Sequence, residues 1–202
     1  MVLQTKIPKQ PSQAIVSYDY VDLTQGFGFE DFFLLIGEEN NSRVYLLVGN
    51  QNHYSVQGDM SMSNEDEKNF DSAEFNQSRT IKGVGHISGS VEAESNAIPY
   101  TLTIKIYKVD SDGNETEVTS SDTVIQPQTE AAPEYYSARI NFKESTIKVG
   151  DKLRVEIVAA VSGGVVLQIG TSPKNQDGDD LAPSGKDCTT ITRISIPFRI
   201  LT

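Results

Sequence analysis

The chain has 202 residues, the length of one large domain or two small ones. Its 28 acidic residues outnumber its 17 Lys and Arg residues, and the formal net charge of −11 excludes the basic surface that nucleic-acid binding needs. A single cysteine excludes a disulfide framework, and no apolar run approaches the roughly 18 residues of a membrane span. We therefore expect neither nucleic acid nor a membrane among its partners.

Residues 1–12 predict an extended N-terminal arm, because Pro8 and Pro11 interrupt any regular pattern there. This arm is either a disordered tail or a segment that docks on a neighbouring subunit. No apolar stretch of about 7–15 residues follows its two lysines, so we expect no secretory signal. Residues 13–202 contain no linker and predict a single domain, and the unpaired Cys188 fits synthesis in a reducing cytosol.

Apolar and polar residues alternate with the period of two that is typical of half-buried strands. The segment 64–75 is the best candidate for a helix, but Phe70 and Phe75 are its only apolar anchors, so we expect a loop or a single turn. We expect the segment 118–125 to pair with the strand that begins at Tyr100. In chain order, the expected strands cover residues 14–23, 43–48, 81–93, 100–107, 118–125, 136–142, 153–161, 164–171 and 194–200.

Two of the expected strands contain residues that strands usually avoid. Gly83, Gly85 and Gly89 share one face of the segment 81–93, which predicts a bend or close packing against another element. Pro197 removes a hydrogen-bond donor from the last strand. We therefore expect that strand at a sheet edge, or its proline turned away from the ladder.

These strands, without a convincing helix, predict an all-β fold. Antiparallel connections follow, because parallel ones need crossovers of about a dozen residues that are usually helical. The uneven connections favour a jelly roll over a plain sandwich. We therefore predict an antiparallel two-sheet β-sandwich, jelly-roll-like, with about 8–10 strands and little helix.

The segment that contains Asp110, Asp112 and Asn114 begins like a calcium loop, with side-chain oxygens at alternate positions. Its glycine falls at the fourth position, and Ser121 stands where a bidentate Glu would complete the loop. Asp-Gly and Gly-Asn are typical of hairpin turns, so a turn is the favoured interpretation and calcium the alternative. We expect no metal and no cofactor elsewhere in the chain.

No motif predicts catalysis. His53 and His86 lie too far apart in the sequence for a recognisable metal motif, and neither a Gly-x-Ser-x-Gly sequence nor a phosphate loop occurs. The acidic residues fall in expected loops or on exposed strand faces, so no carboxylate pair for glycoside hydrolysis stands out. We therefore expect that the protein is not an enzyme.

Four phenylalanines, Phe27, Phe29, Phe32 and Phe33, cluster within seven positions. Aromatic side chains bury the largest areas in protein cores, so this cluster fits a core segment. Aromatic residues are also enriched at protein interfaces, and the four phenylalanines are therefore our candidates for a subunit contact.

Three stretches resemble a group of uncharacterised proteins from marine bacteriophages. The run Ser17–Gly28 is similar to a group pattern of Tyr-x-x-x-Asp-Ile-x-x-Gly-x-Gly. The sequence Asn69-Phe70-Asp71, followed by Arg79–Gly83, is similar to an Asp-Phe-Asp that precedes Pro-Arg-x-Ile-x-Gly, although Gln77-Ser78 stands where the group often has a proline. The run Ile196–Ile200 resembles the C-terminal pattern Val/Ile-Pro-Phe-x-Ile.

The resemblance implies a virion structural protein that decorates or stabilises a capsid, made in the host cytoplasm and located in the virion. Its implied partners are capsid subunits and further copies of itself, with a trimer suggested by analogy to jelly-roll virion proteins. The resemblance transfers no site residues. The alternative that we keep is a carbohydrate-binding or adhesive β-sandwich module of a tail or fibre; the absence of Trp weakens it, although tyrosines could stack on sugar rings.

Overall fold

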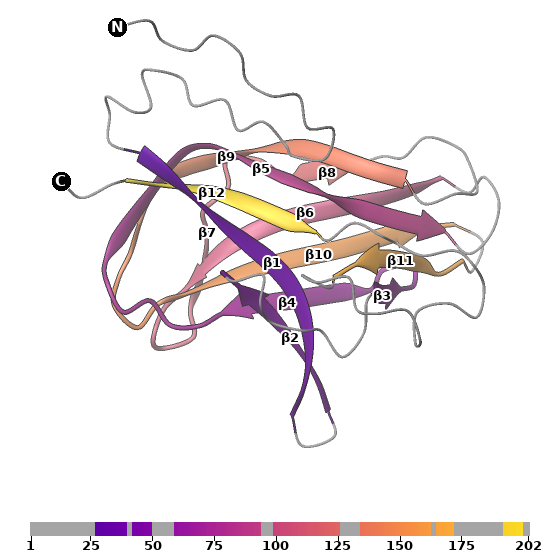
Figure 1. The fold of residues 1–202 in the computed structure, drawn as a ribbon, viewed down its shortest axis with the longest axis horizontal. Helices are drawn as coiled ribbons and strands as arrows, with labels where there is room; N and C mark the ends of the chain where they lie inside the picture. Colours follow the sequence, from indigo (N-terminus) through magenta and orange to yellow (C-terminus); the bar gives the residue numbers. More distant parts are fainter. Residues whose placement is uncertain are drawn as a thin grey trace, which may run out of the picture.

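The computed structural model describes residues 27–39, 42–49, 59–93, 99–125, 134–162, 165–171 and 192–199. These residues form strands and turns, and none of them is helical (Figure 1). The strands are β1 (Phe27–Glu39), β2 (Ser42–Val48), β3 (Asp59–Met62), β4 (Glu67–Ser72), β5 (Arg79–Ala93), β6 (Tyr100–Val109), β7 (Glu115–Glu117), β8 (Thr123–Ile125), β9 (Glu134–Ile147), β10 (Lys152–Val161), β11 (Leu167–Gly170) and β12 (Arg193–Arg199).

Hydrogen bonds join the strands in the order β3–β11–β5–β12–β1–β2–β4–β10–β6–β7, with β8 also on β6 and β9 also on β5. Every pairing is antiparallel except that of β2 with β4, which is parallel at Leu46–Asp71 and Leu47–Ser72. Between these two strands the chain visits β3 at the far end of the order, which lets β4 return in the same direction as β2.

The sheet folds over itself into two layers, which two seams join. The first seam is the parallel contact of β2 with β4, and the second is formed by the contacts of Thr119 and Ser120 with β9. Thr119 forms a bridge with Phe142 of β9, and the Ser120 amide donates to the Asn141 carbonyl at 2.8 Å. The Val118 amide donates to the Ile106 carbonyl of β6 at 2.9 Å, so the segment 118–120 connects β6 with β9, which also pairs with β5. These hydrogen bonds satisfy backbone groups that an open sheet edge would leave unpaired.

The core lies between the two layers. Along β6 and β10 nearly every second residue is buried, as the alternation predicted, and Leu102, Ile104, Val155 and Ile157 are at most 1% exposed. Side chains such as Ile87 of β5 close the core from the other layer. Burial of each such aliphatic side chain stabilises the fold by about 1.5–3 kcal/mol, so this patterning fixes which face of each strand points inward.

The predicted all-β, jelly-roll-like sandwich is confirmed, with twelve described strands in place of about 8–10. Strands β3 and β7 have only four and three residues, which is too short for periodicity to reveal, whereas β11 lies within the expected strand 164–171. The segment 64–75 was wrongly expected to be a loop or turn, because it contains β4, whose Phe70 is fully buried. Residues 1–12 and the expected strand 14–23 lie outside the described residues.

The last strand does not lie at an edge. β12 runs between β5 and β1, so the first of the two expectations for Pro197 is wrong. The second explains the position, because the β12–β5 register shifts between Ser195 and Phe198, and this irregularity accommodates the missing amide donor.

The glycines of β5 produce both of the predicted effects. Gly83 has a φ of +113°, and the β5–β9 register shifts between Ile81 and Gly83. At Gly85 a Cβ atom would lie 2.6 Å from the Phe142 ring and would also collide with the Ser195 carbonyl oxygen. Glycine is required there because β12 and Phe142 both approach the β5 backbone closely.

Candidate functional site

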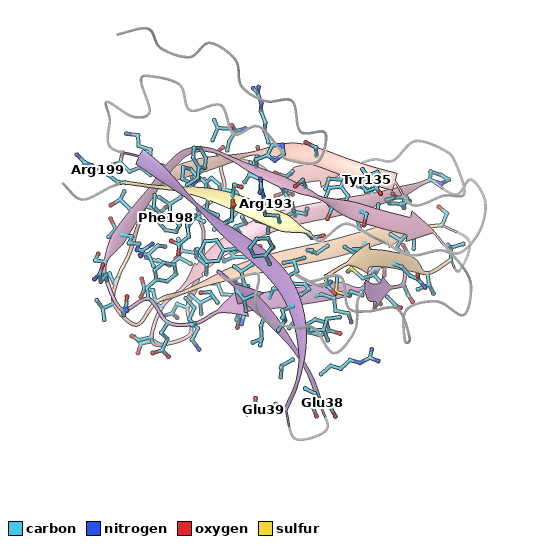
Figure 2. The ribbon with its side chains drawn as sticks, in the orientation of Figure 1. Glu38, Glu39, Tyr135, Arg193, Phe198 and Arg199 are labelled. Atoms are coloured by element: carbon cyan, nitrogen blue, oxygen red, sulfur yellow. The ribbon has the colours of Figure 1, made fainter. Side chains whose placement is uncertain are left out.

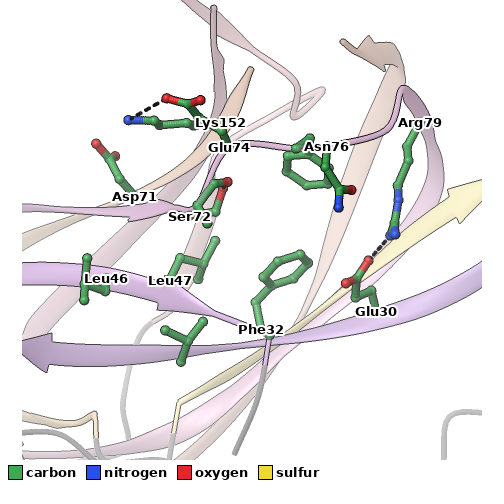
Figure 3. Close-up of a pocket in the computed structure, with 14 residues that line it drawn as sticks. Glu30, Phe32, Leu46, Leu47, Asp71, Ser72, Glu74, Asn76, Arg79 and Lys152 are labelled. Atoms are coloured by element: carbon green, nitrogen blue, oxygen red, sulfur yellow. Dashed lines mark hydrogen bonds and ion pairs between the residues drawn. The ribbon is translucent and has the colours of Figure 1, made fainter. Parts of the chain in front are cut away.

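A groove opens where the first part of β1 extends beyond the end of β2 (Figure 3). β2 pairs with β1 from Phe33 onward, so Glu30 and Phe32 lie beyond its last residue, Val48. The connection from β4 to β5 runs along the other side of this gap. The cavity has a volume of about 630 Å³, which lies within the usual range for small-molecule sites.

The groove combines an apolar interior with a polar rim. Phe32 and Leu47 are buried core side chains that form part of its wall, whereas Leu46 is 37% exposed. The Phe75 ring lies on the connection after β4 and packs with its centroid 5.9 Å from that of Phe198. An apolar body with a few polar groups around it is the usual composition of a ligand site.

Two ion pairs stand at opposite sides of the groove (Figure 3). On one side, Arg79 of β5 donates to the Glu30 carboxylate of β1. On the other, the Lys152 Nζ of β10 lies 3.8 Å from Glu74 Oε1. The groove therefore offers a cation and an anion at each side, and both pairs are solvent-accessible enough to exchange partners with a ligand.

A third acid on the rim is already neutralised. Asp71 of β4 accepts two hydrogen bonds from Arg154, from Nε and Nη2, each at 2.6 Å. The two carboxylate oxygens match the guanidinium fork, a bidentate geometry that is stronger and more specific than a single contact. These hydrogen bonds to Asp71 raise the pKa of Arg154, which stays charged at any ordinary pH.

Arg79 is held in place by aromatic rings. Its guanidinium carbon lies 5.9 Å from the Phe75 centroid and 5.5 Å from the Phe198 centroid, within cation–π range of both. A guanidinium carries five N–H donors, and the acceptor that the described residues offer to this one is Glu30. Arg79 is therefore a positioned cation with donors beyond those that its ion pair uses.

A second hollow of about 310 Å³ adjoins the groove. Arg79 and Glu30 line both hollows, so their ion pair marks the boundary between the two. The other residues that line the smaller hollow are Gly28, Phe29, Gln77, Ser78, Phe198 and Arg199.

The side chains around the groove are suited to binding. The Ser72 hydroxyl donates to the Ala73 carbonyl at 2.8 Å and accepts from the Leu153 amide at 2.9 Å, so both contacts hold the backbone. The described lining residues include no His or Cys. Nowhere in the described part of the chain do three or more His, Cys, Asp or Glu side chains gather in a way that could hold a metal ion.

The calcium candidates form a turn. Asp110 Oδ1 accepts from the backbone amides of Asp112 and Asn114 at 3.0 and 2.8 Å, and the Asn114 side-chain amide donates to Oδ2 at 3.0 Å. Gly113 has the positive φ, +85°, that such a turn requires. The hydrogen bonds from Asn114 lower the pKa of Asp110. Both carboxylate oxygens of Asp110 are thus used within the hairpin between β6 and β7.

The aromatic cluster divides among several environments. Phe32 is 5% exposed and belongs to the core, and Phe33 is 3% exposed on the opposite face of β1, so neither offers a partner much surface. Phe29 is partly exposed and lines the smaller hollow. Phe27 lies in β1, with its side chain outside what the structure describes. Among the described side chains of this cluster, Phe29 therefore reaches the surface, at the smaller hollow.

His86 lies on the outer face of β5. Its Nε2 is 2.8 Å from the Ser137 hydroxyl of β9. Burial, together with the charges of Arg193 and Arg139, lowers the pKa of His86. His53 and Cys188 lie outside the described residues.

No signal in the sequence pointed to the principal residues of the groove. Glu30 and Arg79 are 49 positions apart and form no motif. Only the tertiary structure brings them together, because β1 and β5 both flank β12.

Within the described residues, no helix is long and apolar enough to cross a membrane.

Fold and groove together define a jelly-roll-like β-sandwich with a candidate ligand site. No family model matches the sequence, and neither does any curated protein. Among solved structures, the chain is similar to an α-amino acid ester hydrolase, with a TM-score of 0.60, 10% identity, and coverage of 84% of this chain and 36% of that one. It is also similar to a CocE/NonD family hydrolase from Staphylococcus aureus, with a TM-score of 0.55, 13% identity, and coverage of 85% and 37%.

An aminopeptidase from a marine sediment archaeon, Thaumarchaeota archaeon, shares the fold with a TM-score of 0.55 at 8% identity, over 84% of this chain and 37% of that one. The chain thus spans little more than a third of each of these proteins. The comparisons contradict our expectation that the protein is not an enzyme, because this fold occurs within chains named as hydrolases. At these identities the likeness establishes the fold alone.

Proposed function

We propose that this chain is the ligand-binding β-sandwich of a hydrolytic enzyme, and that the groove beside β1 holds the substrate. The observation that carries this proposal is the arrangement of the groove, with apolar walls between two partly exposed ion pairs. The three hydrolytic proteins that share the fold over about a third of their length support the same context. The class of substrate that fits is a small molecule with an apolar body and a polar acyl group.

The test uses the full chain and 4-phenylbutanamide, an uncharged molecule with a phenyl ring and an acyl amide. We expect saturable binding in amide NMR spectra, with the largest shifts around Phe32, Leu46 and Phe75. Ala73 is exposed and lines the groove, so Ala73→Trp should obstruct it and abolish binding. Ala160→Trp places the same side chain on the exposed face of β10, away from the groove, and should bind as the parent does.

Two results would overturn the assignment. One is the absence of any saturable shift, and the other is binding that survives Ala73→Trp unchanged. Incubation of the chain with ethyl 4-phenylbutyrate, followed by measurement of released ethanol, tests separately whether hydrolysis occurs in this chain or needs a further part of the enzyme.

A structural role in a virus particle, through contacts with capsid subunits or copies of the same chain, is a second proposal. It rests on the sequence resemblance and is supported by the hairpin of β1 and β2, whose far end projects from the body (Figure 1). Glu38, Glu39 and Arg43 at this end are exposed, and the two glutamates point away from the body (Figure 2). A projecting hairpin can reach a neighbouring subunit.

Mass photometry of the full chain tests the second proposal. We expect a discrete oligomer in the parent and a smaller species in the double variant Glu38→Lys and Glu39→Lys. A chain that stays monomeric at every concentration, and does not bind particles from the native source, would overturn it.

A further inference from the structure

Arg79 is the most strongly positioned cation in the groove. The Phe75 and Phe198 rings hold its guanidinium between the two hollows, so its orientation is set before any ligand arrives. Its side chain is still 35% exposed, and the described residues provide one acceptor, Glu30, for its five donors. A guanidinium fork of this kind matches a carboxylate in bidentate geometry.

We propose that the groove binds an organic carboxylate with an apolar body, and that Arg79 is the residue that recognises the carboxylate. This inference rests on the proposed function of the groove and specifies its ligand class. The apolar body would lie against Phe32, Leu46 and Phe75, while the carboxylate takes the Arg79 donors that Glu30 leaves open. Glu30 competes for the same guanidinium and therefore limits the affinity.

Charge complementarity favours this occupant over a cationic one. Asp71 is already held by both donors of the Arg154 fork, and Glu74 faces Lys152. The Glu30 carboxylate faces Arg79, so a cationic ligand at that position would have to displace a guanidinium fixed by two rings. A carboxylate needs only open donors, which Arg79 has.

The test compares 4-phenylbutyrate with the neutral, nearly isosteric 4-phenylbutanamide on the full chain, by isothermal titration at about 0.15 M salt. We expect the carboxylate to bind at least about ten-fold more tightly than the amide, because a charge-assisted hydrogen bond is stronger than a neutral one by about this factor in affinity. Arg79→Gln should reduce this difference to less than about two-fold. Arg79→Lys should restore part of it, because charge returns without the fork.

Glu30→Gln provides a measurement that would stay unchanged if the ion pair had only a structural role. Removing the competing acid should raise carboxylate affinity by about three- to ten-fold and leave amide affinity unchanged. Lys82→Gln removes a cation that lines neither hollow and is the matched control, for which we expect a change of less than about two-fold. Lys152→Gln tests the other cation of the groove.

The outcomes separate the inference from the proposed function. If the amide binds in the groove but the carboxylate binds no more tightly, or if Lys152→Gln abolishes the preference and Arg79→Gln does not, the role of Arg79 is overturned while the groove remains a ligand site. If neither molecule binds, both proposals fall. A loss of carboxylate affinity in Glu30→Gln would likewise overturn the inference.

Discussion

Gly85 shows how closely two parts of the backbone can approach when a side chain is missing. Its position on β5 faces the Ser195 carbonyl of β12 and the ring of Phe142 on β9. A backbone carbonyl in a central strand cannot move aside as the end of a flexible side chain can. The glycine therefore allows the three strands to pack without displacing β12.

We predict that Gly85→Ala lowers the free energy of unfolding by about 1–3 kcal/mol or more, as overpacking of a well-packed site does. Urea denaturation measures the change. Gly49→Ala is the matched control, since a Cβ there would lie 3.8 Å from its nearest neighbour, Glu30 Oε1. An equal effect at both positions would show that close packing at Gly85 is not the cause.

His86 is a residue whose environment opposes its protonation. Arg139 of β9 and Arg193 of β12 both lie near it, and the acid on this face, Asp31, is engaged by the Ser195 hydroxyl at 2.5 Å and by Arg193 at 3.5 Å. Because the folded state holds the pKa of His86 below its ordinary value of 6.5, the unfolded chain takes up this proton first as the pH falls. The contribution to stability is therefore full above the ordinary pKa and is lost as the pH falls toward the folded pKa.

We predict that His86→Gln makes the free energy of unfolding less dependent on pH between about pH 7.5 and 5, with its main effect at the acidic end. Urea denaturation series at several pH values measure this slope. His53→Gln, which removes the other histidine, should keep the contribution of His86. An unchanged slope in His86→Gln would contradict the prediction.

At the scale of elements, Arg154 connects three strands. From β10 it donates to Asp71 of β4 through two nitrogens and, through Nη1, to Glu115 of β7 at 2.5 Å. Its side chain is 24% exposed, so the pairs are partly screened by solvent, and their value lies in the bidentate geometry. These contacts link β4, on one side of β10, with β7, which lies beyond β6 on the other side.

We predict that Arg154→Gln lowers the free energy of unfolding by about 1–2 kcal/mol, with a smaller loss for Arg154→Lys because the charge remains. Lys82→Gln is the control: its pair with Glu144 is more than half exposed on both sides, and we expect a change below about 0.5 kcal/mol. Thermal and urea unfolding give both values. A loss in Lys82→Gln as large as that in Arg154→Gln would contradict a special role for the bidentate pair.

At the scale of the molecule, two seams join the layers. One is the short parallel contact of β2 with β4, and the other links Thr119 and Ser120 to β9. Each seam is brief, but the shared core lies between them. Phe70 of β4 is fully buried and meets the Tyr45 ring of β2 edge-on, with centroids 5.3 Å apart, so packing strengthens the first seam beyond its hydrogen bonds.

We predict that both layers unfold together. The chain has no Trp, so single tryptophans can report locally: Val84→Trp on β5 in one layer and Ala160→Trp on β10 in the other, both at exposed positions. Their urea midpoints should agree with each other and with far-UV circular dichroism within about 0.2 M, as two-state unfolding requires. Separate midpoints for the two reporters would contradict a single cooperative unit.

The local pattern of the sequence determined the strand class and much of the inward face. Alternation in 100–107 and 153–161 reports burial directly, because successive strand residues point to opposite faces. The Asp110 turn was readable for the same local reason, since its hydrogen bonds lie within five consecutive residues. The glycines of β5 likewise predicted close packing, although they did not predict which residues would pack against them.

Only the tertiary structure decided which strands became neighbours. The sequence analysis missed β4 because this strand has a single fully buried Phe70 in place of a periodic apolar pattern. The central strand β12 tolerates Pro197 because its register with β5 shifts at that point. The groove and its Arg79–Glu30 pair arise because β1 and β5 flank the same strand, a relation between distant parts of the chain. Periodicity is a property of neighbours in sequence, so the sequence by itself determined the fold class. A binding site depends on neighbours in space, so only the tertiary structure decided where a ligand would bind.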